Sequence, residues 1–267
     1  MDAVRYWNAA VAGWWAQSRP PAARDGSRDG TLTDPTPSRR RALEALAGGG
    51  SVLDVGCGVG QSSLSLALGT GTPGGSAEHV VGAAPGGSVE LVVGVDSWDH
   101  LLARFAVRAD RLGVPHAEVR GMWPAVAAAV PMADVVVCHH VLYYVDDLTP
   151  FVRALTMRAR RRVVVEIPAV HPHVWMRPLW LRLHGTSTPS GPELGDALAA
   201  LREGGLRVHV ERWTDSRDPW AGQEASMVGH LCDRLALSAG RAPELRALLR
   251  EFGLPPRSRE MATLWWP

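Results

Sequence analysis

The sequence contains no lysine, because all 28 of its basic residues are arginine. A phosphate-binding loop that depends on lysine and a lysine that forms a Schiff base are therefore both excluded. The 28 basic and 27 acidic residues almost cancel, which leaves a formal net charge of +1. This balance gives no electrostatic reason to expect binding to nucleic acid or to an acidic membrane.

Cysteine and long apolar runs are also scarce. Cys57, Cys138 and Cys232 are odd in number and far apart, and their spacing fits neither a disulfide framework nor a metal site. No apolar run approaches the roughly 20 residues that a membrane-spanning helix needs, and the polar, tryptophan-rich N-terminus is unlike a signal peptide. We therefore expect a soluble cytoplasmic protein without a bound metal and without membrane contact.

The rest of the composition is that of an ordinary globular chain of 267 residues, long enough for one α/β domain with an appended element. Short β-type runs alternate with helical periods along most of it. The predicted strands are residues 51–55, 91–95, 117–120, 133–138, 163–167, 206–213 and 260–266. The alternation predicts a parallel sheet covered by helices on both faces, with ligands at the carboxyl ends of the strands.

One stretch combines a strand, a glycine-rich turn and the start of a helix. It contains Asp54, then glycine at positions 56, 58 and 60, and the helix begins at Gln61. The glycines permit positive φ and let backbone N–H groups approach a ligand. Gln61 stands where a dinucleotide fingerprint has its third glycine, which argues against a nicotinamide oxidoreductase. Asp54 would face the pyrophosphate of a dinucleotide, whereas a cofactor that carries an amine favours a carboxylate there.

The pattern Asp-x-Gly-x-Gly-x-Gly closely resembles the first motif of class I S-adenosylmethionine-dependent methyltransferases of the small-molecule type. The resemblance covers residues 40–167 well and the rest of the chain only by topology. It implies a Rossmann-like, doubly wound, seven-stranded α/β sheet, mostly parallel with an antiparallel last strand, and a helical substrate cap. It also implies S-adenosyl-L-methionine as the cofactor.

The resemblance places this cofactor across the carboxyl ends of the first strands. Asp96 closes the second strand and can accept both ribose hydroxyls, or it caps the next helix, as Ser97 can. Trp98 either stacks on adenine or packs in the core. Met122 stands where the family often has an aspartate for the adenine amino group, so that hydrogen bond comes from the backbone or is absent. The implied cofactor site consists of Asp54, Gly56, Cys57, Gly58, Gly60, Asp96, Ser97, Trp98, Met122, Trp123 and His139.

The fourth strand opens into a segment that resembles the family's fourth motif and contains His139, His140 and Tyr143. Methyl transfer to a heteroatom is an in-line displacement, so the protein mainly aligns two ligands and excludes water. A base within hydrogen-bond reach helps where the acceptor is a hydroxyl or a protonated amine. These three residues are the catalytic candidates, with Glu166 and His171 at the same edge of the sheet, and each has a structural alternative.

We expect the chain to consist of an N-terminal segment and one large domain. Residues 1–37 comprise a helix with an aromatic face and a linker, and the helix either packs on the core or forms a lid. Residues 38–267 form the methyltransferase domain, with a mobile insertion at 70–88 of low complexity. Two further elements, residues 168–190 and 214–255, form the substrate cap.

We therefore expect an S-adenosylmethionine-dependent methyltransferase that modifies oxygen or nitrogen of a small, hydrophobic or aromatic metabolite. Arginines at 158 and 160–162 form one basic cluster, which is either an RNA-binding patch or a solvated helix end. The cluster precedes the fifth strand, which puts it at the amino ends of the strands, opposite the expected cleft. We expect no nucleic-acid partner. The alternatives are a non-catalytic domain that binds a cofactor or a partner, and an RNA methyltransferase.

Overall fold

The computed structural model describes residues 2–17, 35–68, 89–218, 220 and 222–267. Most of the linker predicted in the N-terminal segment and the whole insertion predicted at 70–88 lie outside the described residues. Within these ranges, the helices are all too short or too polar to cross a membrane.

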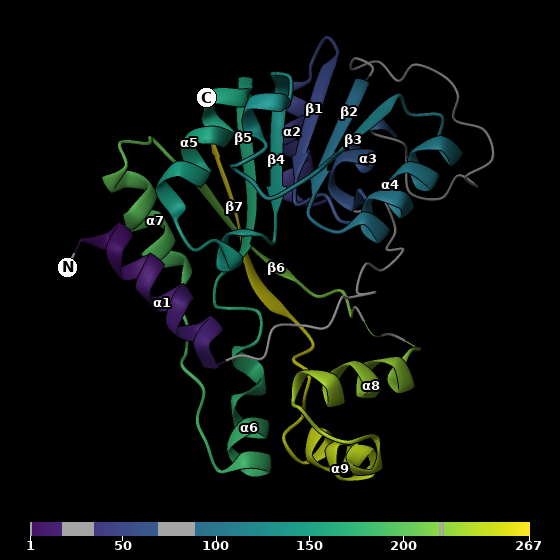
Figure 1. Ribbon diagram of the computed structural model, residues 1–267, viewed down its shortest axis with the longest axis vertical. Helices are drawn as coiled ribbons and strands as arrows, with labels where there is room; N and C mark the ends of the chain where they lie inside the picture. Colours follow the sequence, from purple (N-terminus) through teal and green to yellow (C-terminus); the bar gives the residue numbers. More distant parts are fainter. Residues whose placement is uncertain (1, 18–34, 69–88, 219, 221) are drawn as a thin grey trace.

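One mixed sheet forms the centre of the described molecule (Figure 1). Its strands are β1 Gly50–Val55, β2 Val89–Asp96, β3 His116–Arg120, β4 Ala133–His139, β5 Ala159–Pro168, β6 His209–Asp215 and β7 Arg259–Trp266. They lie in the order β3-β2-β1-β4-β5-β7-β6. β7 is antiparallel to its neighbours β5 and β6, and the other neighbouring pairs are parallel. The predicted fold class is therefore confirmed.

Helices cover both faces of this sheet (Figure 1). They are α1 Ala3–Gln17, α2 Pro37–Ala45, α3 Gln61–Ala67, α4 Asp99–Arg111, α5 Leu148–Arg158, α6 Arg177–His184, α7 Leu194–Glu203, α8 Glu224–Arg234 and α9 Ala242–Glu251. Trp7 of α1 and Phe151 of α5 belong to the apolar core on one face, which α7 also joins. Leu64 of α3 and Phe105 of α4 belong to the core on the other face. The valine-rich central strands are buried on both faces, as a covered parallel sheet requires.

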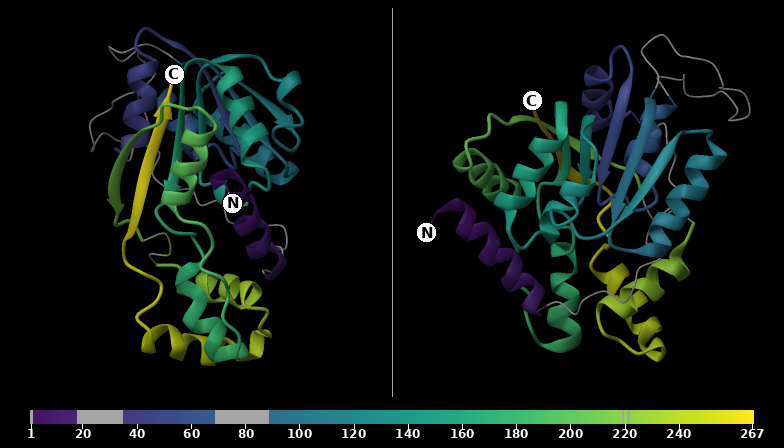
Figure 2. Two further views of the ribbon diagram at one scale, coloured as in Figure 1. Left: turned by 90° about the vertical axis from the view of Figure 1, so that its left-hand side faces the viewer. Right: turned by 45° about the horizontal axis from the view of Figure 1, so that its top comes forward.

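Helix α1 packs beside α7 and supports the start of α5 (Figure 2). The side chain of Asn8 accepts a hydrogen bond from the backbone N–H of Leu148 at 3.2 Å and donates one to Asp147 at 3.3 Å. Asp147 is the N-cap of α5 and makes no side-chain cap bond itself. The residue types of Thr149 and Pro150 favour an N-cap at Thr149 and a first helical residue at Pro150. Helix α5 instead begins at Leu148, where Asn8 of α1 provides the side-chain cap.

The start of α2 also differs from what the residue types suggest. Thr36 is its N-cap and accepts a hydrogen bond from the N–H of Arg39 at 3.1 Å, with Pro37 as the first helical residue. Ser38, which is equally suited to capping, is buried instead. Its hydroxyl lies 2.7 Å from the hydroxyl of Thr263 on β7. Ser38 therefore joins a helix to the sheet.

The basic cluster lies mainly inside β5, because the strand starts at Ala159 and not after the arginines. Arg160 and Arg161 form ion pairs with Asp134 at 3.7 and 3.2 Å, and Arg162 forms one with Glu44 at 3.3 Å. These contacts lie at the amino end of the strand. The cluster therefore joins β4, β5 and α2 through charge pairs.

A small helical cap extends beyond the carboxyl ends of β5 and β6 (Figures 1 and 2). It contains α6, in a segment whose prolines suggest irregular structure, and the pair α8 and α9. These helices share a separate core that includes Leu179, Leu231 and Leu245. The chain enters the α8–α9 pair after Asp215, the last residue of β6, and returns at Arg259, the first residue of β7.

One buried carboxylate joins these two crossings. Asp215 accepts hydrogen bonds from Arg217 at 2.6 and 3.1 Å and from Arg259 at 2.9 Å. Burial raises the pKa of Asp215, but the two guanidinium groups outweigh this and hold it below its usual value. The carboxylate is therefore a clamp between the sheet and the cap.

We expect Asp215→Asn to lower the free energy of unfolding by about 1.5–3 kcal/mol, because charge-assisted hydrogen bonds are lost. A depressed pKa stabilises the folded state above the unfolded value of about 3.9, and this stabilisation disappears as the pH falls towards the folded value. The difference between the variant and the wild type should therefore shrink below about pH 4 in urea unfolding curves. Asp233→Asn, at an exposed position of α8, is the control. An equal loss in both variants would contradict the clamp.

Candidate functional site

The glycine-rich turn after β1 is bound to the end of β2. Gly56, Gly58 and Gly60 have φ of 75°, 54° and 77°, the left-handed region that glycine adopts without strain. The N–H groups of Gly56 and Cys57 both donate to the carbonyl of Val95, at 2.8 and 3.0 Å. Gly60 is the N-cap of α3 without a side-chain cap bond. The turn thus presents the amino terminus of α3 at the carboxyl edge of the sheet.

Two of these glycines are also required by close packing. A Cβ atom on Gly56 would collide with the side chain of Val141, and one on Gly60 would lie 2.6 Å from the ring of Phe105. A Cβ on Gly58 would meet nothing within 4 Å. Val141 follows β4, so the segment after β4 lies directly against the glycine turn.

Asp54, near the end of β1, is a buried carboxylate. Its Oδ2 accepts a hydrogen bond from the hydroxyl of Ser63 on α3 at 2.7 Å. Burial raises the pKa of Asp54 to about 7, and the negative charge of Asp96 adds to the increase. A cation beside this carboxylate would compensate its charge and favour the ionised form. The sequence pattern predicts the helix that contains Ser63 but does not include Ser63 in the cofactor site.

Asp96 connects the turn to the next strand. One of its oxygens accepts the N–H of Gly58 at 2.9 Å, and the other accepts the N–H of Trp98 at 3.0 Å. Trp98, and not Ser97, is the N-cap of α4, and Asp96 provides the side-chain bond there. The two interpretations of Asp96 are compatible, because each carboxylate oxygen has a second lone pair for a hydroxyl donor.

Two large apolar side chains lie exposed at the ends of neighbouring strands. Trp98 follows β2 and is 43% exposed, and Met122 follows β3 and is 66% exposed. The ends of these strands pair directly, through Asp96 and Arg120. Trp123 differs from them: its indole is buried and its Nε1–H donates to the carbonyl of Phe151 at 3.2 Å. The side chain of Trp123 therefore belongs to the core, so only its backbone could take its predicted place in the cofactor site.

His139 and His140 meet Glu166 where β4 and β5 end. His139 pairs with Glu166 across the two strands. His140 has φ of 61°, unusual for a residue with a side chain, and its backbone N–H donates to the carbonyl of Glu166 at 2.8 Å. Its Nε2 lies 3.0 Å from a carboxylate oxygen of Glu166. The structure thus brings together three of the residues that the sequence placed at this edge.

The electrostatics of these three groups differ. Burial raises the pKa of Glu166, but the imidazoles of His139 and His140 and a hydrogen bond from Ser38 outweigh it and hold the pKa below its usual range. Burial lowers the pKa of His139 to about 4, so its imidazole is neutral at pH 7. Its Nε2 is buried and has no hydrogen-bond partner among the described residues. Glu166 is therefore an acceptor and His139 a neutral polar group.

Tyr143 has a structural role. It is fully buried, its hydroxyl donates to the carbonyl of Pro168 at 2.9 Å, and its ring stacks on Trp7 at a centroid distance of 5.5 Å. Burial raises the pKa of its hydroxyl well above the usual value. Tyr143 therefore lacks the freedom to act as a base, although its place in the sequence suggested it.

His171, after β5, packs against α1. Its ring lies 4.0 Å from that of Trp14 and its Nδ1 accepts the N–H of His173 at 3.3 Å. Burial lowers the pKa of His171 to about 3. These aromatic contacts join the N-terminal helix to the segment that leads into the cap. Among the described residues, no group of three or more His, Cys, Asp and Glu side chains could hold a metal ion.

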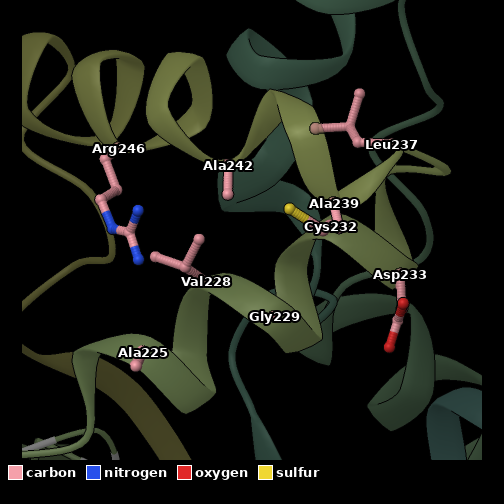
Figure 3. A pocket seen from close by; sticks show the side chains of 9 residues that line it. All are labelled: Ala225, Val228, Gly229, Cys232, Asp233, Leu237, Ala239, Ala242 and Arg246. Carbon is pink, nitrogen blue, oxygen red and sulfur yellow. The ribbon is translucent and has the colours of Figure 1, made fainter.

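The cap contains a pocket of about 290 Å³ between α8 and α9 (Figure 3). Small side chains and Cys232 line it, and Arg246 projects from α9 towards α8. None of its lining residues comes from the ends of β1, β2 or β4. This pocket is therefore separate from the carboxylates and histidines described above.

Comparisons with known proteins bear on the fold of the chain. No protein-family model matches the sequence, and no curated protein does. A SAM-dependent methyltransferase from Thiobacillus denitrificans, solved in complex with S-adenosyl-L-homocysteine, is 18% identical, with a TM-score of 0.54 over 100% of this chain and 99% of that chain. One from Geobacter sulfurreducens, also in complex with S-adenosyl-L-homocysteine, is 18% identical, with a TM-score of 0.52 over 97% of each chain. The protein has the class I S-adenosylmethionine-dependent methyltransferase fold.

The glycine turn of this methyltransferase fold yields a direct test. Gly58→Ala should cost about 1–2 kcal/mol of folding free energy, from its left-handed backbone alone. Gly56→Ala should cost clearly more, because it adds a collision with Val141. The double variant Gly56→Ala/Val141→Ala should recover part of the difference. The measurement is urea unfolding of the wild type and of four variants, with Val141→Ala as the fourth. Equal costs for the two glycine variants would refute the close contact.

Proposed function

We propose that the protein is a methyltransferase that uses S-adenosyl-L-methionine and methylates oxygen or nitrogen of a small, hydrophobic or aromatic molecule. The observation that carries this proposal is a pair of buried carboxylates, Asp54 and Asp96, on either side of a glycine turn at the carboxyl edge of a methyltransferase fold. The fold alone is compatible with many functions. The chemistry of this pair is specific to a ligand with an amine and a ribose.

The residues at this edge fit such a cofactor. Asp54 is buried with a raised pKa, and an ammonium group would compensate its charge. Asp96 would accept the ribose hydroxyls with its remaining lone pairs. Trp98 and Met122 would cover the two faces of a flat base, which removes exposed apolar surface from water. The bound cofactor supplies a methyl group on a positively charged sulfur, and the protein orients the acceptor and excludes water.

The acceptor would lie between this edge and the cap. The end of β4 contributes His139, and the segments that follow β4 and β5 contribute His140 and His171. Helix α1 closes their side through Trp14. The imidazoles of His139 and His140 remain our catalytic candidates. In our proposal the N-terminal helix α1 of segment 1–37 is a lid beside the acceptor site. The described residues of the elements 168–190 and 214–255, within domain 38–267, form the rest of the cap.

A small molecule is favoured over RNA by the positions of the arginines. Nucleic acid requires several phosphate contacts, but Arg160, Arg161 and Arg162 make ion pairs at the amino end of β5. A nucleic acid held there would be at the opposite end of the strand from His139 and His140.

Asp96→Ala should weaken the binding of S-adenosyl-L-homocysteine by about 2–3 kcal/mol, because charge-assisted contacts to the ribose are lost. Isothermal calorimetry measures the change directly. Asp110→Ala, at an exposed position further along α4, is the matched control and should bind normally. Unchanged affinity in Asp96→Ala would sink the assignment of the cofactor site.

Asp54 predicts how this binding depends on pH. Its pKa of about 7 means that the carboxyl of the free protein is mostly protonated at pH 6 and ionised at pH 8. A cationic amine binds the ionised form better, so affinity for S-adenosyl-L-homocysteine should rise over this interval and then level off. In Asp54→Asn the affinity should be lower at pH 8 and nearly constant between pH 6 and 8. A wild-type affinity that falls over the same interval would contradict this role.

A further inference from the structure

The inference concerns the contact between His140 and Glu166, and it rests on the proposed function. Glu166 holds His140 at two points, by its backbone carbonyl and by its carboxylate. His140 makes both contacts from a left-handed backbone conformation with φ of 61°. Strained backbone that is held in place by surrounding contacts is frequent at functional sites.

The contact fixes which nitrogen of the neutral imidazole bears the hydrogen. An ionised carboxylate only accepts hydrogen bonds, so the Nε2 of His140 must donate to Glu166. The lone pair of a neutral ring then lies on Nδ1. The side chain of His140 is 47% exposed at the carboxyl edge of the sheet, next to Val141, which touches the glycine turn. A basic nitrogen is thus available beside the proposed cofactor site.

The carboxylate of Glu166 has further neighbours on α2, β7 and β4. Ser38 of α2 donates a hydrogen bond to Glu166, and Ser38 also contacts Thr263 of β7. Glu166 and Thr263 are direct neighbours across β5 and β7. His139 faces the same carboxylate from β4 as a neutral ring. Glu166 is therefore fixed from three elements and has one exposed imidazole to orient.

We propose that His140 is the general base of the reaction, that Glu166 is its positioning residue, and that the acceptor group is a hydroxyl. The hydroxyl proton passes to Nδ1 of His140 while the oxygen lone pair forms the new bond to the methyl carbon. The electrons of the breaking carbon–sulfur bond stay on sulfur, which leaves S-adenosyl-L-homocysteine. Glu166 stabilises the imidazolium that forms.

A hydroxyl fits this arrangement better than an amine, a thiol or a carboxyl. A protonated amine would bring a second positive charge next to the sulfonium, whereas a hydroxyl is neutral until its proton leaves. A thiol or an acidic carboxyl ionises more readily and needs such a base less. The oriented base is therefore most useful for an alcohol or a phenol.

The test uses cofactor labelled with ¹³C at the methyl group and a library of aromatic and aliphatic hydroxyl, amine, thiol and carbon-acid compounds. The ¹³C shift of the product identifies the methylated atom. We expect O-methyl products, and we expect His140→Asn to lower kcat by about 100-fold or more at pH 7. Asparagine tolerates the left-handed backbone at this position. Glu166→Gln should fall between His140→Asn and wild type.

The pH profile separates a base from a structural residue. With a phenol as acceptor, the defect of His140→Asn should shrink as the pH rises towards the pKa of the phenol at about 10, because the acceptor then ionises without help. The affinity for S-adenosyl-L-homocysteine should stay unchanged. Glu118→Gln removes a similar carboxylate–imidazole contact, 3.2 Å from His116 on β3, and is the control that should keep full activity. A defect in His140→Asn that is the same at every pH would overturn the assignment.

The outcomes distinguish this inference from the proposed function. Products methylated on nitrogen overturn the hydroxyl acceptor and leave the proposed function intact. Products methylated on sulfur or carbon also contradict the restriction of the proposed function to oxygen and nitrogen. Binding of S-adenosyl-L-homocysteine without any methylated product from the library contradicts both. Lack of this binding contradicts the cofactor assignment, which the calorimetry above tests separately.

Discussion

The carboxylate of Asp96 is the contact on which the proposed cofactor site depends. It accepts the N–H of Gly58 and the N–H of Trp98, so it joins the glycine turn after β1 to the start of α4. The turn needs such an anchor because its three glycines have no side chains that could hold it in place. Val95 adds two backbone bonds from the same strand. A ligand that also binds Asp96 therefore meets a turn that is already in position, which lowers the entropic cost of binding.

Buried carboxylates define this edge of the sheet, and each one is compensated differently. Asp54 has a hydroxyl partner and a raised pKa, Asp96 has two backbone donors, and Glu166 has an imidazole and a hydroxyl. A buried carboxylate without a cation is costly, which is why Asp54 is the group most responsive to a cationic ligand. Arginines pair with carboxylates at the opposite edge of the sheet. The near-neutral chain therefore keeps its negative site and its basic cluster apart.

The sequence predicted the features that depend on local pattern. The glycine motif, the mostly parallel sheet with an antiparallel last strand and the carboxyl-edge positions of Asp54, Asp96 and Glu166 follow from runs of a few residues and from topology. The features that local pattern does not reveal have long-range causes. Asn8 of α1 caps α5 from 140 positions away. Thr36 caps α2, while Ser38 forms hydrogen bonds with Thr263 of β7 and with Glu166. Trp123 and Tyr143 stand beside functional positions in the chain, but their rings turn into the core, which only the packing of α1 and α5 decides.

Strand β7 connects the cap to the proposed catalytic pair. At its start Arg259 binds Asp215, where the chain enters and leaves the helices α8 and α9. Four residues later Thr263 lies opposite Glu166 and contacts Ser38. Residues i and i+4 of a strand share one face. Arg259, which binds Asp215 at the cap, and Thr263, which lies opposite Glu166, are therefore on the same face of β7. A cap that closes over an acceptor would therefore do so relative to a fixed base, as in-line methyl transfer requires.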